Sequence, residues 1–383
     1  MARSPIPPRG SNRVPSSPRL AGVERLLRLA AARGASMLYL TSGARPAIRV
    51  DGEMMPLESE PPLDADQLES LILEVVPERS REALRSGEIT EWITEVPDVG
   101  RVRCVIFRDH RGPGVIFRMI ATRAVSAEQL GLSRELHELC LERDGLVVVT
   151  GPRASGKSTL LSAFIDLVNR ARRDLIVTLE TQIAFVHDNR NSIVSQREIR
   201  GGQDALLVAA RAALREDPDV LVIEDFGSAD LVSVALEAAE SGHLVIGTLT
   251  APSTTAAVGR LVDLVPADRR PQFQNALAET LRGVVAQVLL RKSAGGRVAA
   301  RELLLNTHAV ATLVAEGKIS QLPAALDSGR RQGMVPLNDA LVAFVQSGVI
   351  EAREAYRKAS DRQGFLNRLR REGIDTSFVE RLA

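Results

Sequence analysis

The sequence predicts an α/β protein with two domains, a small α+β domain followed by a larger domain built on a parallel sheet. The chain has 383 residues, which at about 150 residues per domain makes two or three compact units. Residues 20–120 combine helical spacing with hairpin-like strand pairs, and residues 132–383 begin with short apolar strands that alternate with helices. Strands that are apolar on both faces are typical of a parallel sheet covered by helices.

Composition indicates an ordinary globular protein and argues against nucleic-acid binding. The hydrophobic fraction is 45% and the charged fraction 25%, and the net charge is +1. With aromatic residues at 3%, the chain offers neither a strong positive field nor many stacking surfaces, so we expect no nucleic-acid partner. Two cysteines, Cys104 and Cys140, cannot form a four-thiolate zinc site, and we expect both to be buried, reduced thiols.

Residues 1–19, MARSPIPPRGSNRVPSSPR, predict a disordered basic tail. They lack the apolar core of a secretory signal, and their five prolines are incompatible with the amphipathic helix of a transit peptide. No apolar run approaches the ~18 residues that a transmembrane helix needs. The sequence therefore predicts a cytoplasmic protein.

The first domain is expected to span residues 20–120, and residues 121–131 to form a linker. Leu20, Val23, Leu26, Leu27 and Leu29 have the spacing of one helical face. Alternating residues and a glycine-containing turn predict strands beyond it. In chain order, we expect a helix at 20–33, strands at 37–43 and 46–57, helices at 64–76 and 77–86, a strand at 91–96 and a hairpin at 100–120.

The second domain is expected to span residues 132–383 and to become mostly helical from about residue 254. Its alternating strands and helices predict the parallel sheet, and two later strands predict a hairpin. The expected strands are 145–151, 175–180, 219–225, 243–249, 285–292 and 296–305, and the expected helices between the first four are 155–171, 205–217 and 231–242.

The most specific motif is a phosphate-binding loop, GPRASGKST, between an expected strand and an expected helix. Its glycines let backbone N–H groups turn toward phosphate oxygens, and the helix N-terminus adds a positive dipole. We expect Lys157 to reach the β- and γ-phosphates of ATP and the Ser158 hydroxyl to bind Mg²⁺. The expected nucleotide-binding residues are Gly151, Ala154, Ser155, Gly156, Lys157, Ser158 and Thr159.

Carboxylates end two of the expected parallel strands. The strand DVLVIED closes on Glu224 and Asp225, the form of a Walker B strand, in which Asp225 would hold the metal together with Ser158. The strand LIVTLE ends at Glu180. Ligands of such sheets bind beyond the carboxyl ends of the strands, and the pattern alone leaves open whether Glu180 faces the nucleotide.

Several blocks in one order resemble the PilT-type retraction ATPases of type IV pili, within the secretion ATPase superfamily. The resemblance runs from about Gly22 to the C-terminus and rests on GASMLYLTSG, IRVDG, GRVRCVIFRDHRG with GVIFR, the phosphate loop, TLE, VSQREI, ALREDPDVLVIED, ESGHLVIGTL and GRVAARELLLNT. It implies a homohexameric ring. In each subunit, a PAS-like N-terminal domain would precede a RecA-like P-loop ATPase domain with a helical C-terminal extension.

The resemblance also implies roles for single residues. Glu180 falls on the catalytic glutamate that polarises the attacking water, and Asp225 on the Walker B carboxylate. His243 falls on the first histidine of the family's His box, which would sense or stabilise the γ-phosphate. Arginines of the N-terminal domain can approach a neighbour's nucleotide, where they would stabilise charge in the transition state; the alternative is a salt-bridged strand face. The matching arginines are Arg103, Arg111 and Arg118.

The chain departs from the family pattern at positions that handle charge. Carboxylates of the family are replaced by Thr181 and Ala184, the Walker B arginine by Gly227 and the second histidine by Thr250. The segment at 309–316, AVATLVAE, lacks both arginines of the family's retraction motif, and Met37 and Tyr39 replace an acid and a histidine. These substitutions predict a retained nucleotide pocket with reduced turnover.

The leading functional hypothesis is an ATP-hydrolysing motor subunit that drives retraction of type IV pili, as in twitching motility. The alternative is a non-catalytic or regulatory nucleotide-binding paralogue. A pilus-assembly or type II secretion ATPase is disfavoured because two separated cysteines cannot supply the tetracysteine zinc insert of those relatives. The resemblance further implies peripheral association with the inner membrane, a platform protein there as partner, and a paralogous pilus ATPase as a second partner.

Overall fold

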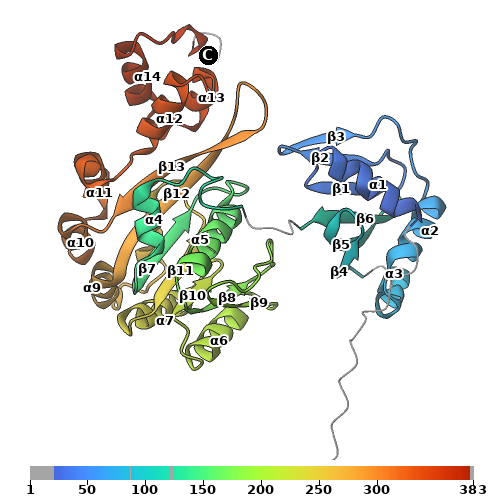
Figure 1. Ribbon diagram of the computed structural model, residues 1–383, viewed down its shortest axis with the longest axis horizontal. Coiled ribbons are helices and arrows are strands. Elements are labelled where there is room, and N and C mark those ends of the chain that lie inside the picture. Colours follow the sequence, from blue (N-terminus) through green and yellow to red (C-terminus); the bar gives the residue numbers. More distant parts are fainter. Residues whose placement is uncertain (1–20, 87, 121–124, 380–383) are drawn as a thin grey trace, which may run out of the picture. The chain divides into compact units, whose positions relative to one another are not determined.

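The computed structural model describes residues 21–86, 88–120 and 125–379, which form two compact units that divide near residue 122 (Figure 1). The tail predicted at 1–19 and part of the linker predicted at 121–131 lie outside the described residues. Each unit contains one β-sheet with its own apolar core. The mixed α/β architecture predicted from the sequence is confirmed.

The first unit is built on a six-stranded antiparallel sheet with the order β3-β2-β1-β6-β5-β4. Helices α1 and α2 contribute Leu26, Leu27, Leu68 and Ile72 to the apolar core beside the sheet. The elements are α1 Ala21–Ala32, β1 Met37–Thr41, β2 Ala47–Val50, β3 Glu53–Pro56, α2 Ala65–Val75, α3 Arg81–Ser86, β4 Thr90–Val96, β5 Gly100–Asp109 and β6 Gly112–Met119, with a 3₁₀ turn at Glu78–Ser80.

One strand prediction in this unit is wrong. The segment expected as a single strand at 46–57 forms two strands, β2 and β3, that pair antiparallel with each other. Asp51 and Gly52 adopt φ angles of 49° and 89°. An Asp-Gly pair with two positive φ values makes the tight turn of a hairpin, which reverses the chain here.

The second unit is built on a seven-stranded sheet with the order β13-β12-β7-β11-β10-β8-β9, parallel except for the β12–β13 pair. Helix α4 and strand β9 were not expected from the sequence. The elements up to β13 are α4 Arg134–Cys140, β7 Gly145–Thr150, α5 Lys157–Ala171, β8 Leu175–Glu180, β9 Ile193–Glu198, α6 Gly202–Leu214, β10 Val220–Ile223, α7 Ala229–Glu240, β11 Leu244–Leu249, α8 Thr254–Asp263, α9 Arg270–Thr280, β12 Leu281–Arg291 and β13 Arg297–Leu305.

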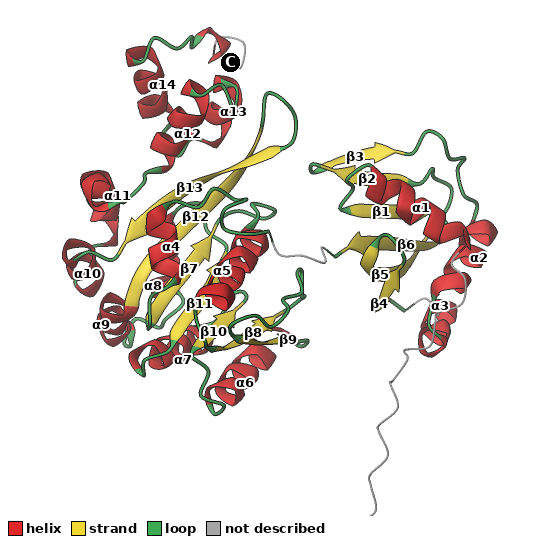
Figure 2. Ribbon diagram, in the orientation of Figure 1, coloured by secondary structure: helices red, strands yellow, loops and turns green. Residues whose placement is uncertain are grey.

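Helices cover both faces of this sheet, which is why its inner strands β7, β10 and β11 are buried along their whole length (Figure 2). On one face, α4 and α5 contribute Leu136 and Phe164 to a core with Val147 and Val149. On the other, α6 to α9 pack against Val148 and Leu221. Because β7, β8, β10 and β11 run parallel, their carboxyl ends share one edge of the sheet.

Short helices follow the sheet: α10 His308–Ala315, α11 Leu322–Ser328, α12 Leu337–Gln346, α13 Ala352–Lys358 and α14 Arg362–Arg371. Helices α12, α13 and α14 share an apolar core with the β12–β13 hairpin, to which Leu290, Leu341, Phe365 and Leu369 contribute (Figure 1). Among the described residues, no helix has the length and apolarity to cross a membrane. Both cysteines are free and buried, as expected.

Candidate nucleotide-binding site

The phosphate loop connects β7 to α5 and has a backbone that needs glycine at its two ends. Gly151 has a φ of 148° and Gly156 a φ of 86°. A Cβ atom on Gly151 would lie 2.4 Å from the Gln287 carbonyl oxygen, and one on Gly156 would lie 2.8 Å from Gln287 Nε2. Strand β12, which carries Gln287, therefore packs so closely on the loop that larger residues do not fit at either position.

Lys157 opens α5 and turns back over the loop. Its Nζ atom donates hydrogen bonds to the carbonyl oxygens of Gly151 at 2.9 Å and Pro152 at 3.0 Å. Burial lowers the pKa of Lys157, and the carboxylates of Asp225 and Glu224 raise it, so both lie within electrostatic reach of the ammonium group. A bound phosphate would supply this half-buried cation with a stronger acceptor than the loop carbonyls.

Ser155 adds a buried hydroxyl to the same loop. The residue is 3% exposed, and its Oγ atom has no hydrogen-bond partner in the described part of the chain. An unpaired buried hydroxyl carries a desolvation cost, which a ligand or water in the loop would reduce.

Two carboxylates follow β10, and each is fixed by a polar neighbour. Glu224 accepts hydrogen bonds at 2.8 Å from both the backbone N–H and the hydroxyl of Thr181. Asp225 adopts a φ of 66° and donates its backbone N–H to the Thr248 hydroxyl, while its carboxylate accepts from Gln203 Nε2 at 3.2 Å. These hydrogen bonds fix both the backbone and the carboxylate of Asp225.

Glu180 ends β8 as a nearly buried carboxylate. The residue is 8% exposed, and its Oε1 atom accepts hydrogen bonds from the Thr178 hydroxyl at 2.7 Å and from Gln196 Nε2 at 3.1 Å. Burial raises the pKa of Glu180; the two hydrogen bonds lower it in part, and the charge of Glu224 raises it further. A raised pKa moves a carboxylate toward the range useful for a general base.

The oxygen donors of this site fit Mg²⁺. Ser158 presents an exposed hydroxyl beside Lys157, and Asp225 presents a carboxylate within electrostatic reach of the same lysine. Mg²⁺ binds through one or two such groups together with phosphate oxygens and waters, and needs no cage of protein ligands. No group of three or more His, Cys, Asp or Glu side chains within the described ranges has the arrangement of a metal site.

The structure does not bring His243 to the phosphate loop of the chain. His243 immediately precedes β11, whose first residue, Leu244, pairs with Gly145 at the start of β7. The phosphate loop follows the other end of β7, about 20 Å away at the rise of a strand. The imidazole Nδ1 instead donates to the Pro218 carbonyl oxygen at 2.7 Å. Thr250, which takes the second histidine position, follows β11 at the loop end of the sheet.

The candidate arginines lie in the first unit. Arg103 and Arg118 are cross-strand partners on β5 and β6. Arg103 is 3% exposed and forms an ion pair of 3.5 Å with Glu91, whereas Arg118 is exposed. Arg111 is exposed between the two strands. Arg103 therefore takes part in the salt-bridged strand face that was the alternative reading of the sequence.

Three glutamines were missed by sequence reasoning. Gln196 binds Glu180, Gln203 binds Asp225, and Gln287 donates to the Ser155 carbonyl oxygen at 2.8 Å. Each is a neutral side chain that hydrogen-bonds a carboxylate or a backbone carbonyl of the site. Neither a charge nor a sequence motif therefore identifies it in the sequence. The one sequence signal is Gln287, a lone amide in the apolar strand VAQVLL.

The substituted positions make contacts of their own. Thr181 supports Glu224, as described above. Gly227 donates its N–H to Gln203 Oε1 at 3.1 Å, and a Cβ atom there would lie 2.6 Å from the amide carbon of Gln203. The backbone of Ala184 lowers the pKa of Glu180 by hydrogen bonding. Thr181, Ala184 and Gly227 therefore contact side chains that form or support the site.

Comparison with known families adds an independent observation. Residues 98–374 match the family described as "Type II/IV secretion system protein". The chain is 37% identical to the Type IV pilus retractation ATPase PilT of Pseudomonas aeruginosa over 343 residues. This match covers 90% of the chain and 99% of that protein. It is 34% identical to a twitching motility protein of Neisseria gonorrhoeae, over 88% of the chain and 90% of that protein.

Solved structures agree with the sequence comparison. The crystal structure titled "Pilus Retraction Motor PilT and Bound ADP" superposes with a TM-score of 0.79 at 33% identity, covering 89% of this chain and 98% of that one. The ATPase DotB of Legionella pneumophila superposes with the same TM-score of 0.79 at 25% identity, covering 87% of this chain and 94% of that one.

Proposed function

The chain belongs to the Type II/IV secretion system protein family, among its PilT-type members, and we propose that it is an ATP-hydrolysing subunit of a ring motor that acts on type IV pili. The observation that carries this proposal is that the phosphate loop with Lys157 follows β7, while Glu224 and Asp225 follow β10, at the shared carboxyl edge of one parallel sheet. A cation, a glycine-shaped loop and two fixed carboxylates at one sheet edge are the parts that phosphoryl transfer to water requires.

In this proposal, the loop residues 151–159 bind the phosphates of ATP, and Lys157 exchanges its loop carbonyls for phosphate oxygens. Ser158 and Asp225 would hold Mg²⁺, which would supply charge neutralisation at the phosphates when bound. Glu180 orients the attacking water and accepts its proton, because its raised pKa suits a base. Thr178 and Gln196 hold that carboxylate in place.

Assembly into a homohexameric ring is part of the proposal. Arg118 is exposed on the first unit and would approach the nucleotide of a neighbouring subunit, where a guanidinium stabilises negative charge. Arg103, its cross-strand partner, would contribute after exchanging Glu91 for phosphate. We also propose a cytoplasmic ring that sits peripherally at the inner membrane, bound to the pilus platform protein and, in some assemblies, to a paralogous pilus ATPase.

Turnover is proposed to be slower than that of an ordinary retraction motor. Thr181, Ala184, Gly227 and Thr250 replace charged or imidazole side chains, and each position lies at the carboxyl end of the strands that carry the site. Neutral hydrogen bonds, such as those of Thr181 to Glu224, replace charge only in part. The same four substitutions favour the second candidate, a regulatory paralogue that binds nucleotide without driving retraction.

The cellular role is tested in the host by deleting the gene and counting retraction events of labelled pili. We expect retraction to fall, to return with the wild-type chain, and not to return with Lys157→Ala. Unchanged retraction in the deletion strain would contradict a role as the motor. Rescue by Lys157→Ala to the wild-type level would favour a role that does not depend on nucleotide.

A further inference from the structure

Arg301 is linked to the phosphate loop through Gln287 and forms no ion pair with an acidic residue in the described part of the chain. It sits on β13 directly across from Gln287 on β12. Its Nε atom donates to Gln287 Oε1 at 2.8 Å, and its Nη1 atom donates to the Leu130 carbonyl oxygen at 3.1 Å. The adjacent carboxylate, Glu302, is bonded instead to the N–H and hydroxyl of Thr254 at 2.7 Å.

The environment of this guanidinium is unusual for an arginine. Burial lowers the pKa of Arg301 to about 10, and no carboxylate among the described residues forms an ion pair with it. Holding a cation in a partly desolvated place without a counter-ion costs free energy, which hydrogen bonds from the cation must offset. Its two acceptors are neutral oxygens, which leaves the positive charge uncompensated.

Gln287 bridges Arg301 and the phosphate loop by hydrogen bonds. The glutamine is 3% exposed, and its amide nitrogen donates to the Ser155 carbonyl oxygen at 2.8 Å. Because Arg301 binds the oxygen of the amide, the nitrogen can only point toward the loop. The same nitrogen lies where a side chain on Gly156 would be, so the amide fixes the turn that precedes Lys157.

We propose that Arg301 is a positioning residue for the phosphate loop, acting through Gln287 to hold the peptide of Ser155 and Gly156 in the orientation that binds nucleotide phosphates. The inference rests on the proposed nucleotide-binding function. It predicts that Arg301 affects the affinity for nucleotide through Gln287 and does not itself contact the nucleotide.

The test measures binding of the non-hydrolysable analogue AMP-PNP with Mg²⁺ by calorimetry, using the full chain. The variants are Arg301→Met, Gln287→Met, their combination and Arg301→Lys. We expect each Met variant to raise Kd about tenfold, the loss expected for a charge-assisted hydrogen bond. The combined variant should bind no more weakly than Gln287→Met alone, because residues acting in series are not additive. Arg301→Lys, which keeps the charge, should lose less.

Arg297→Met is the matched control, since Arg297 begins the same strand and is exposed. A merely structural role would lower the number of binding-competent sites while leaving Kd unchanged, and that result would overturn the inference. Wild-type affinity in Arg301→Met, or losses that multiply in the combined variant, would also overturn it. Absence of AMP-PNP binding in the wild type would instead reject the proposed nucleotide-binding function.

Discussion

Lys157 is the residue whose loss should affect nucleotide affinity most directly. Its ammonium group donates hydrogen bonds to loop carbonyls and lies within electrostatic reach of Asp225 and Glu224. On ATP binding, phosphate oxygens would replace the loop carbonyls as its acceptors. Lys157→Ala removes the cation that faces the phosphates. We expect affinity for ATP to fall about tenfold or more with the fold intact, because charge-assisted hydrogen bonds are among the strongest in proteins. Equal affinity in a titration would contradict the assignment of the loop.

Glu180 should set the acid limb of the pH profile. Its pKa is raised by burial, so the carboxylate is protonated, and lost as a base, at a higher pH than an ordinary glutamate. Thr178→Val removes a hydrogen bond that lowers this pKa. We therefore expect the acid limb of kcat/KM to move to higher pH by about one unit, the equivalent of one charged hydrogen bond. Ser195→Ala, on the neighbouring strand, serves as control, and a shift toward lower pH would contradict the role of Glu180.

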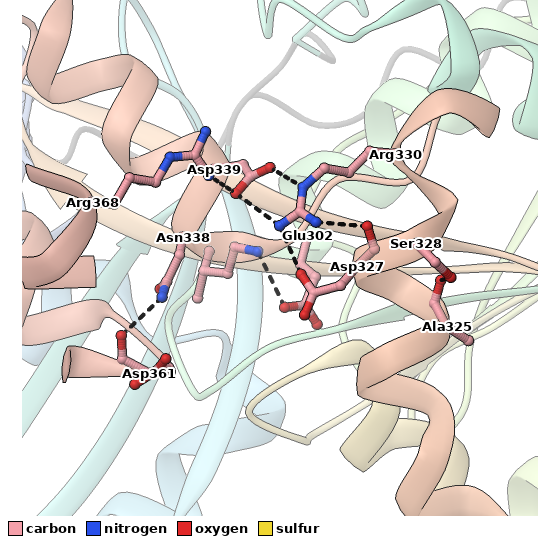
Figure 3. A network of polar contacts seen from close by, with 10 residues as sticks. Glu302, Ala325, Asp327, Ser328, Arg330, Asn338, Asp339, Asp361 and Arg368 are labelled. Atoms are coloured by element: carbon pink, nitrogen blue, oxygen red, sulfur yellow. Dashed lines mark hydrogen bonds and ion pairs between the residues drawn. The ribbon is translucent and has the colours of Figure 1, made fainter. Parts of the chain in front are cut away.

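Among the elements, the C-terminal helices are tied to one another by a network of charges around Asp339 (Figure 3). Asp339 on α12 accepts from Arg330, which follows α11, at 2.6 Å and from Arg368 on α14. Arg330 also pairs with Asp327 at 2.7 Å. Glu302 joins in by accepting from the backbone N–H of Leu337 at 3.3 Å. One carboxylate thereby links two helices and the turn after a third.

Asp339→Asn should loosen this attachment. The Asp339 side chain is 19% exposed and its two arginines about 40%, so solvent screens the pairs and the expected loss of unfolding free energy is about 1 kcal/mol. Asp327→Asn is the control, because Asp327 is 61% exposed and binds one arginine, and it should cost less. Urea unfolding measures both. Equal midpoints for Asp339→Asn and wild type would show that the network adds no stability.

Most elements of the larger sheet could be predicted because apolar strands alternate with helices, and the phosphate loop because its spacing is specific. Strand β9 escaped prediction since IVSQRE is polar and lies at the sheet edge, where neither face is fully buried. The hairpin of β2 and β3 was missed because the prediction of one continuous strand did not allow for the positive φ angles of Asp51 and Gly52. The glutamine contacts of the site depend on sheet register, which one sequence does not reveal. The distance of His243 from the loop, by contrast, follows from its place at the amino end of an expected parallel strand.

For the whole molecule, nucleotide should promote ring formation. If Arg118 meets a neighbour's phosphates, ATP binds the ring better than the free subunit and stabilises it by linkage. We expect mass photometry to show a shift toward hexamers with AMP-PNP, and a smaller shift for Arg118→Ala. The matched control is Arg101→Ala, because Arg101 is exposed like Arg118 and lies on the neighbouring strand β5. A monomer under all conditions at micromolar concentration would contradict the ring.

Steady-state release of phosphate from ATP, by the wild type beside Lys157→Ala and Glu180→Gln, tests the central claim most directly. We predict measurable wild-type turnover below the range of about 1–100 s⁻¹ that is typical of kinases, and near-complete loss in both variants. Glu180→Gln should still bind AMP-PNP, because its amide keeps the shape of the site but cannot accept a proton. Wild-type release no faster than that of either variant would contradict the claim that this site hydrolyses ATP.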